Sequence, residues 1–152
     1  MFSTIVIGLD GSDHSLKAVD YAKLLANPDA VIHVVHVREL LMGRGVGGSP
    51  VKIDDDEIVA QIKAILSKIE AAGLKTQLHI PETIRDSPAS VIAETAADVH
   101  ADVIVIGSRG HGPVAGLLLG SVAQRLLHFA TCPVFVIPVG VGTASAPQAA
   151  AG

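Results

Sequence analysis

Residues 4–12 read Thr-Ile-Val-Ile-Gly-Leu-Asp-Gly-Ser, and this stretch decides the class of fold. Its first six residues form a continuous apolar run, which is typical of a strand buried on both faces of a sheet. Asp10 and Gly11 end the run, and Ser12 is a good N-cap for a helix that apolar spacing predicts as far as residues 27–28. A buried strand that leads directly into a helix indicates a parallel sheet with crossover helices.

The same alternation of strand and helix continues along the chain. Further strands are predicted at residues 30–37, 74–80, 102–106 and 133–139. Three further helices are predicted: one whose first turn holds the acidic run 54–57, one with Pro88 at its first position after the Asp86-Ser87 cap, and one marked by Val122, Leu126 and Phe129. Residues 41–50 contain four glycines and are predicted to form a flexible loop. The order predicts an α/β fold, an open and doubly wound parallel sheet with helices on both faces.

Composition excludes several classes of function. The chain has 152 residues, of which 49% are apolar and 17% charged, and its formal net charge is −4. We therefore expect one globular domain over residues 1–139, followed by a disordered Ala/Gly-rich tail over residues 140–152. Lys and Arg form no cluster, which argues against a nucleic-acid partner. Since the chain shows no secretory signal, no uninterrupted spanning segment and a single cysteine, Cys132, we expect a cytoplasmic protein that is not inserted in a membrane.

Two loops follow strands that should end at the same edge of the sheet, where open α/β folds bind ligands. The first is residues 8–12. The second, residues 107–121, contains glycines at 107, 110, 112, 116 and 120 and opens a helix at Gly120-Ser121. Backbone amides and the positive end of the helix dipole can hold an anion there, with Arg109 as a planar donor. Because little fixed positive charge is available, a triphosphate would bring Mg²⁺ with it.

The spacing Gly107-x2-Gly110-x9-Gly120-Ser121 resembles the G-x2-G-x9-G-[ST] signature of the ATP-binding universal stress proteins. The resemblance extends from Gly8-Leu9-Asp10 to the segment 132–137 and covers about residues 2–139. It implies a Rossmann-like, five-stranded parallel sheet in the order 3-2-1-4-5, of the adenine nucleotide alpha hydrolase type.

The resemblance also implies which residues bind the nucleotide. Gly8, Leu9 and Asp10 match the segment at the adenosine and ribose. Val37 matches a position whose backbone pairs with adenine. The positions that match the ribose and phosphate side are Gly107, Ser108, Arg109, Gly110, Gly120, Ser121 and Val122. The implied ligand is ATP, ADP or AMP with Mg²⁺, for which Asp10 and Ser121 are the candidate protein ligands.

Each of these interpretations has an alternative. Asp10 could cap the first helix instead of binding ribose, and the acidic run 54–57 could bind a cation instead of matching a helix dipole. Ala123 departs from relatives that carry a hydroxyl there, and His111 is not part of the signature. His33 and His36 lie three apart in a strand and cannot share a metal, and the other histidines show no ligand spacing.

The resemblance and the uncharged fifth strand predict how the protein works. Val134, Phe135, Val136, Ile137 and Val139 leave an edge open to pair with a second copy, which predicts a homodimer and leaves a tetramer open. We expect a nucleotide-responsive regulator of a stress response or of an unknown protein partner. A slow ATPase or phosphotransferase is the alternative, which the absence of an evident general base disfavours. A dimeric interaction module without nucleotide is the second alternative.

Overall fold

The computed structural model describes residues 1–43, 47–109 and 119–140. Within these ranges the chain forms, in order, β1 (Phe2–Gly8), α1 (Asp13–Leu25), β2 (Ala26–Val35), β3 (Arg38–Met42), β4 (Pro50–Lys52), α2 (Asp56–Ala71), β5 (Lys75–His79), β6 (Glu82–Thr83), α3 (Pro88–Asp98), β7 (Val103–Gly107), α4 (Ser121–Phe129) and β8 (Val134–Ile137). The last twelve residues of the expected tail, 141–152, lie outside the described ranges.

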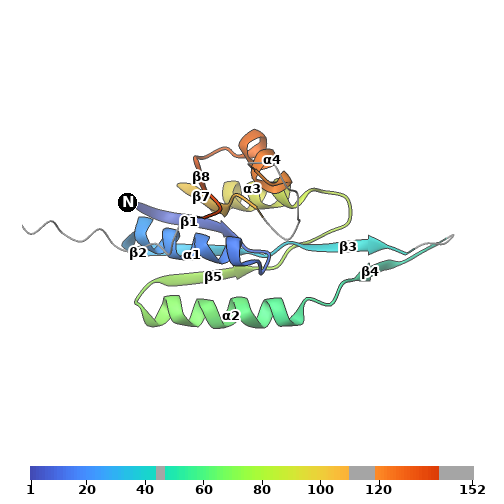
Figure 1. The fold of residues 1–152 in the computed structure, drawn as a ribbon, viewed down its shortest axis with the longest axis horizontal. Helices are drawn as coiled ribbons and strands as arrows, with labels where there is room; N and C mark the ends of the chain where they lie inside the picture. Colours follow the sequence, from blue (N-terminus) through green and yellow to red (C-terminus); the bar gives the residue numbers. More distant parts are fainter. Residues whose placement is uncertain (44–46, 110–118, 141–152) are drawn as a thin grey trace, which may run out of the picture.

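The main sheet has five strands in the order β5-β2-β1-β7-β8, and every pairing in it is parallel. In chain order these are the five predicted strands, so the expected order 3-2-1-4-5 is confirmed. β1 lies at the centre, with β2 on one side and β7 on the other, as Figure 1 shows.

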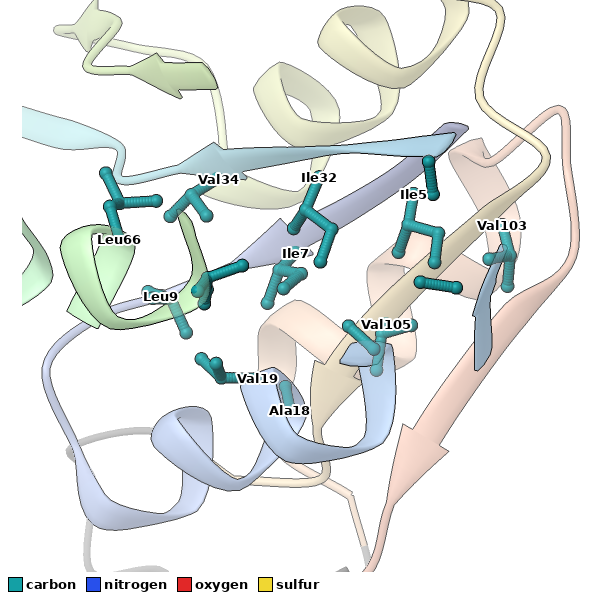
Figure 2. Close-up of a cluster of buried hydrophobic side chains, with 14 of the residues drawn as sticks. Ile5, Ile7, Leu9, Ala18, Val19, Ile32, Val34, Leu66, Val103 and Val105 are labelled. Atoms are coloured by element: carbon teal, nitrogen blue, oxygen red, sulfur yellow. The ribbon is translucent and has the colours of Figure 1, made fainter. Parts of the chain in front are cut away.

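Two apolar clusters cover the two faces of this sheet. On one face, α1 and α2 pack against Ile5 and Ile7 of β1 and their neighbours, which Figure 2 shows in close-up. On the other face, α3 and α4 pack against Val6 of β1 and against β7. Ile5, Val6 and Ile7 of β1 thus point alternately into opposite clusters and are fully buried, which explains why this part of the strand is apolar.

Helix starts follow the predicted capping residues. The Ser12 side chain accepts a hydrogen bond from the Ser15 amide at 3.2 Å, and Ser87 does the same for Ser90. Pro88 occupies the first turn of α3, as expected for a residue that lacks an amide donor. These short-range contacts explain why the starts of α1 and α3 could be read from sequence.

Two local predictions differ from the structure. β2 begins at Ala26, so the Asn27-Pro28 pair that was expected to end the first helix lies inside a strand. The predicted loop 41–50 contains the end of β3 and the start of β4, which pair in antiparallel fashion, with β6 on the other side of β3. This second sheet extends beyond the helices (Figure 1).

No helix in the described part of the chain is long and apolar enough to cross a membrane.

Two adjacent leucines of α4 test the packing of the second cluster. Leu126 is fully buried, whereas Leu127 is 55% exposed. We expect Leu126→Ala to lower the free energy of unfolding by about 2–5 kcal/mol, because it removes buried methyl groups and leaves a cavity. Leu127→Ala, the matched control, should change it by less than about 0.5 kcal/mol. Urea unfolding at one protein concentration measures both, and equal losses would contradict this packing.

Candidate functional site

A cleft of about 450 Å³ opens at the carboxyl ends of β1 and β7. It is lined by the ends of these two strands, by the segment that follows β2, and by the first turns of α3 and α4. After β1 the chain turns to α1 on one face of the sheet, and after β7 it continues to α4 on the other face. The cleft therefore lies at the switch point of the sheet, where open α/β folds hold their ligands.

The structure brings most of the predicted site residues to this cleft. Its lining includes Gly8, Leu9, Asp10, Val37, Gly107, Ser108, Arg109, Gly120, Ser121 and Val122. Gly110 and His111 lie outside the described residues. Ala123, where relatives were expected to carry a hydroxyl, also lines the cleft and is buried.

The start of α4 supplies an anion-binding surface. Gly120 is the N-cap, and its amide donates to the Ser108 carbonyl at 2.6 Å, which fixes the helix start beside the end of β7. The first-turn amides of a helix have no partner within the helix, and the dipole places partial positive charge on them. Ser121 and Val122 occupy this first turn in the lining of the cleft. A phosphate at this position would meet backbone donors.

Ser108 presents a buried hydroxyl that has no partner within the described residues. The residue is 2% exposed and lines the cleft. Its amide donates to the Ile137 carbonyl at 2.8 Å, and its carbonyl accepts from Gly120, so the backbone is held on both sides. An unsatisfied buried hydroxyl costs free energy, and such groups are rare in folded proteins. A polar ligand in the cleft would supply the missing hydrogen bond.

Asp10 supports the loop after β1. Its Oδ1 accepts from the Ser12 amide at 2.9 Å and from the Ser12 hydroxyl at 2.6 Å. Ser12, not Asp10, caps α1, so the alternative that Asp10 is the cap is wrong. The Asp10 amide also donates to the Ser15 hydroxyl at 3.3 Å. The loop is thereby fixed in shape before any ligand arrives.

Gly107 has a packing role that the sequence did not indicate. A Cβ at this position would lie 2.7 Å from the backbone carbonyl oxygen of His14 in α1. This is closer than carbon and oxygen can approach, so only glycine lets α1 pack against the end of β7. Gly107 was predicted from the phosphate-loop pattern, but its close contact is with the first turn of α1.

Three side chains, His36, Arg38 and Asp55, connect the loop after β1 to the start of α2, and we call them the Asp55 cluster. The His36 ring contacts the Leu9 carbonyl through Nδ1 at 2.9 Å and Asp55 Oδ2 through Nε2 at 2.7 Å. The ring thus joins the Leu9 carbonyl to the Asp55 carboxylate through its two nitrogens. Arg38 donates from Nε to Asp55 Oδ2 at 2.9 Å, and its terminal nitrogen Nη2 forms an ion pair with Asp55 Oδ1 at 2.7 Å. The cleft residue Leu9 is thus connected to the start of α2.

Asp55 was predicted as part of an acidic first turn that matches the helix dipole. The structure places it at the N-cap of α2 with a side chain that makes no capping hydrogen bond and instead binds Arg38 and His36. The Arg38 guanidinium lowers the pKa of Asp55 to about 2, against the opposing effect of burial, and the His36 hydrogen bond adds to the lowering. No group of three or more His, Cys, Asp or Glu side chains in the described ranges could hold a metal ion, so the cation alternative for residues 54–57 finds no support there.

Several lining residues were missed from sequence. Ser15, Val35, Glu39, Pro88, Ile92, Ile106, Leu119 and Gln124 complete the lining. Glu39 follows Val37 by two residues, so the two-residue period of extended chain could have placed it on the same side. Pro88 and Ile92 come from α3, and only the packing of that helix against the sheet brings them to the cleft.

The Asp55 cluster predicts how stability responds to acid. Because the folded pKa of Asp55, about 2, lies below its ordinary value of 3.8, the stabilisation is complete above about pH 4 and is lost as the pH falls through 2. We expect Asp55→Asn to be less stable than wild type at pH 7, and the difference to shrink below pH 4. Urea midpoints from pH 2 to 7 measure this. The exposed neighbour variant Asp56→Asn should show no such convergence, and a constant difference for Asp55→Asn would contradict the assignment.

Comparisons with known proteins agree with this architecture. Residues 1–138 match the model of the universal stress protein family. A universal stress protein of Methanocaldococcus jannaschii is 34% identical over 143 residues, which cover 90% of this chain and 82% of that protein. A universal stress protein of Thermus aquaticus is 30% identical, with 90% of this chain and 99% of that protein covered.

Two similar structures contain adenine nucleotides. A universal stress protein from Archaeoglobus fulgidus in complex with dAMP has a TM-score of 0.62 and 27% identity, covering 88% of this chain and 96% of that one. A universal stress protein in complex with cAMP has a TM-score of 0.60 and 28% identity, covering 94% and 98%. The fold, the position of the cleft and the match over nearly the whole chain show that this protein belongs to the universal stress protein family.

Proposed function

We propose that this chain binds an adenine nucleotide in the cleft between β1 and β7 and acts as a homodimeric, nucleotide-responsive regulator. The observation that carries the nucleotide site is the buried Ser108 hydroxyl, which has no partner among the described residues and lies beside the first turn of α4. The dAMP and cAMP complexes of similar proteins support the same class of ligand.

The lining of the cleft suits the parts of such a ligand. Val37, Ile92 and Ile106 offer apolar surface for a base. Asp10 offers a carboxylate to ribose hydroxyls. The start of α4, Ser108 and Arg109 offer donors to phosphate. The nucleotide would bind mainly through backbone and neutral groups at its phosphate end.

The charges of the cleft bear on the number of phosphates. Its described lining contains two carboxylates, Asp10 and Glu39, and one guanidinium, Arg109. ATP would bring more negative charge than this lining offsets, so we propose that it binds with Mg²⁺. Carboxylate and hydroxyl oxygens are ligands that Mg²⁺ accepts alongside phosphate, and Asp10 and Ser121 in the lining are of these types. AMP carries less charge and should depend less on the metal.

A regulatory role requires only that the nucleotide binds one conformation better than others. The loop after β1 contacts the nucleotide side through Asp10 and is connected to α2 through Leu9 and His36. Occupation of the cleft would therefore stabilise the loop and α2 together. We propose that a partner protein recognises the stabilised surface.

Strand β8 is the proposed dimer interface. It is an edge of the main sheet, it carries no charge, and Phe135 on it is 41% exposed. The carbonyls of Pro133 and Ile137 accept from β7. Because backbone groups alternate along a strand, those of Val134 and Val136 point away from β7 and are placed to pair with a second copy.

Ser108→Ala tests the nucleotide site. Without ligand, this variant should be as stable as wild type or more stable, because it removes an unsatisfied buried hydroxyl. Its affinity for nucleotide should fall by about 2- to 12-fold, the effect of losing one hydrogen bond of about 0.5–1.5 kcal/mol. Calorimetric titration with ATP, ADP and AMP, each with and without Mg²⁺, measures the affinities.

Ser67→Ala is the matched control, because Ser67 is an exposed serine of α2 outside the cleft lining. Its affinity should equal that of wild type. The ultraviolet spectrum of the supernatant after denaturation shows whether the purified protein carries an adenine nucleotide. Wild-type protein that neither carries nor binds one would refute the proposal, and unchanged affinity in Ser108→Ala would refute the role of this hydroxyl.

Val136→Pro tests the dimer. Proline removes the outward amide of β8 and leaves the hydrogen bonds to β7 at Pro133 and Ile137 in place. We expect wild type and the control Val136→Ala to sediment as dimers and Val136→Pro as a monomer with an unchanged circular dichroism spectrum. A monomeric wild type, or a dimeric Val136→Pro, would place the interface elsewhere.

A further inference from the structure

A pair of histidines lies on the main sheet outside the cleft. His33 of β2 and His79 of β5 come from neighbouring parallel strands, in which His33 lies opposite Gln77 and Val35 lies opposite His79. Their side chains therefore share one face of the sheet, two register positions apart. His33 Nδ1 lies 3.0 Å from His79 Nε2, and the two ring centroids are 5.3 Å apart.

The two facing nitrogens hold one proton between them. At this distance one nitrogen donates and the other accepts, so a second proton is excluded while the pair is intact. Burial, and to a lesser degree the neighbouring His79, lower the pKa of His33. The neutral imidazole nitrogen is the form in which histidine binds metal ions.

We propose that His33 and His79 form a bidentate site for a divalent transition-metal ion such as Zn²⁺, Ni²⁺ or Cu²⁺. When the shared proton moves to the other nitrogen of the ring that carries it, that ring stays neutral and both facing lone pairs are directed to one point. Two nitrogens at tetrahedral zinc, each about 2.0–2.1 Å from the metal, lie about 3.3 Å apart. The observed 3.0 Å needs to open by only a few tenths of an ångström.

The ligand set determines which metals fit. Imidazole nitrogen suits zinc, nickel and copper, whereas Mg²⁺ and Ca²⁺ prefer oxygen. In the described ranges no third His, Cys, Asp or Glu joins the pair, so water or an added ligand completes the coordination. The site is distinct from the cleft, because neither histidine lines it. His33 is buried and His79 half-buried on the edge strand β5, so access is from that edge.

A metal ion at this position would bridge two strands through residues that are 46 positions apart in sequence. Because the unfolded chain does not hold the two rings together, the metal would bind the folded state preferentially and stabilise it. β2 leads directly to Val35 and Val37 of the cleft, so the bridge would strengthen the sheet next to the proposed nucleotide site.

The experiment uses untagged full-length protein, stripped of metal with EDTA and then dialysed. We expect Zn²⁺ to bind with 1:1 stoichiometry by calorimetry and to raise the melting temperature, whereas Mg²⁺ at the same concentration does neither. His79→Gln should weaken Zn²⁺ binding by about tenfold or more. The matched control His128→Gln, at an exposed histidine of α4, should bind as wild type does.

A measurement on wild type keeps the test independent of the stability of the variant. The electron paramagnetic resonance spectrum of the Cu²⁺ complex should show coupling to imidazole nitrogens, which His79→Gln reduces and His128→Gln retains. An oxygen-only spectrum, equal Zn²⁺ affinity in His79→Gln and wild type, or no binding by wild type would overturn the proposal and leave the histidines as a hydrogen-bonded pair that binds no metal.

Discussion

β1 and β7 are adjacent parallel strands, and the chain leaves their carboxyl ends toward opposite faces of the sheet. This divergence opens the cleft, because α1 and α4 pack on opposite faces of the sheet. The close contact of Gly107 with the His14 carbonyl brings α1 against the end of β7. The position of the loop after β1, and with it that of Asp10, depends on this contact.

Around the cleft some polar groups have hydrogen-bond partners within the described residues and others do not. The loop after β1 is held internally by Ser12 and Asp10 and connected to α2 by His36 and Asp55. The other side of the cleft holds the buried Ser108 hydroxyl and the start of α4. One wall is thus fixed by its own hydrogen bonds, and the other retains donors for a ligand. This asymmetry is what a preorganised anion-binding site requires.

Sequence patterns predicted the elements whose causes are local. Ser12 and Ser87 cap helices because each hydroxyl reaches an amide three residues on. β1 and β7 were identified because burial on both faces demands uninterrupted apolar residues. β3, at residues 38–42, was not predicted, because its residues Leu41 and Met42 are exposed and give no burial pattern. These two residues pair with the short strand β4 in a region that was predicted to be a loop because it is rich in glycine. The start of β2 was predicted at residue 30 instead of Ala26, because an Asn-Pro pair usually ends an element. In the structure Asn27 and Pro28 lie in the irregular first part of the strand, where the pairing with β1 changes register.

The sequence alone determined the alternation of elements, the glycine spacing of the second loop and the family resemblance, because these depend on residues close together in the chain. Only the tertiary structure decided that Asp55 pairs with Arg38 and His36, that Pro88 and Ile92 line the cleft, and that His33 faces His79. Those contacts join residues from different elements, and their distances are fixed by sheet order and helix packing. Sheet order and helix packing are not encoded in the spacing of neighbouring residues, so these contacts could not be predicted from the sequence pattern.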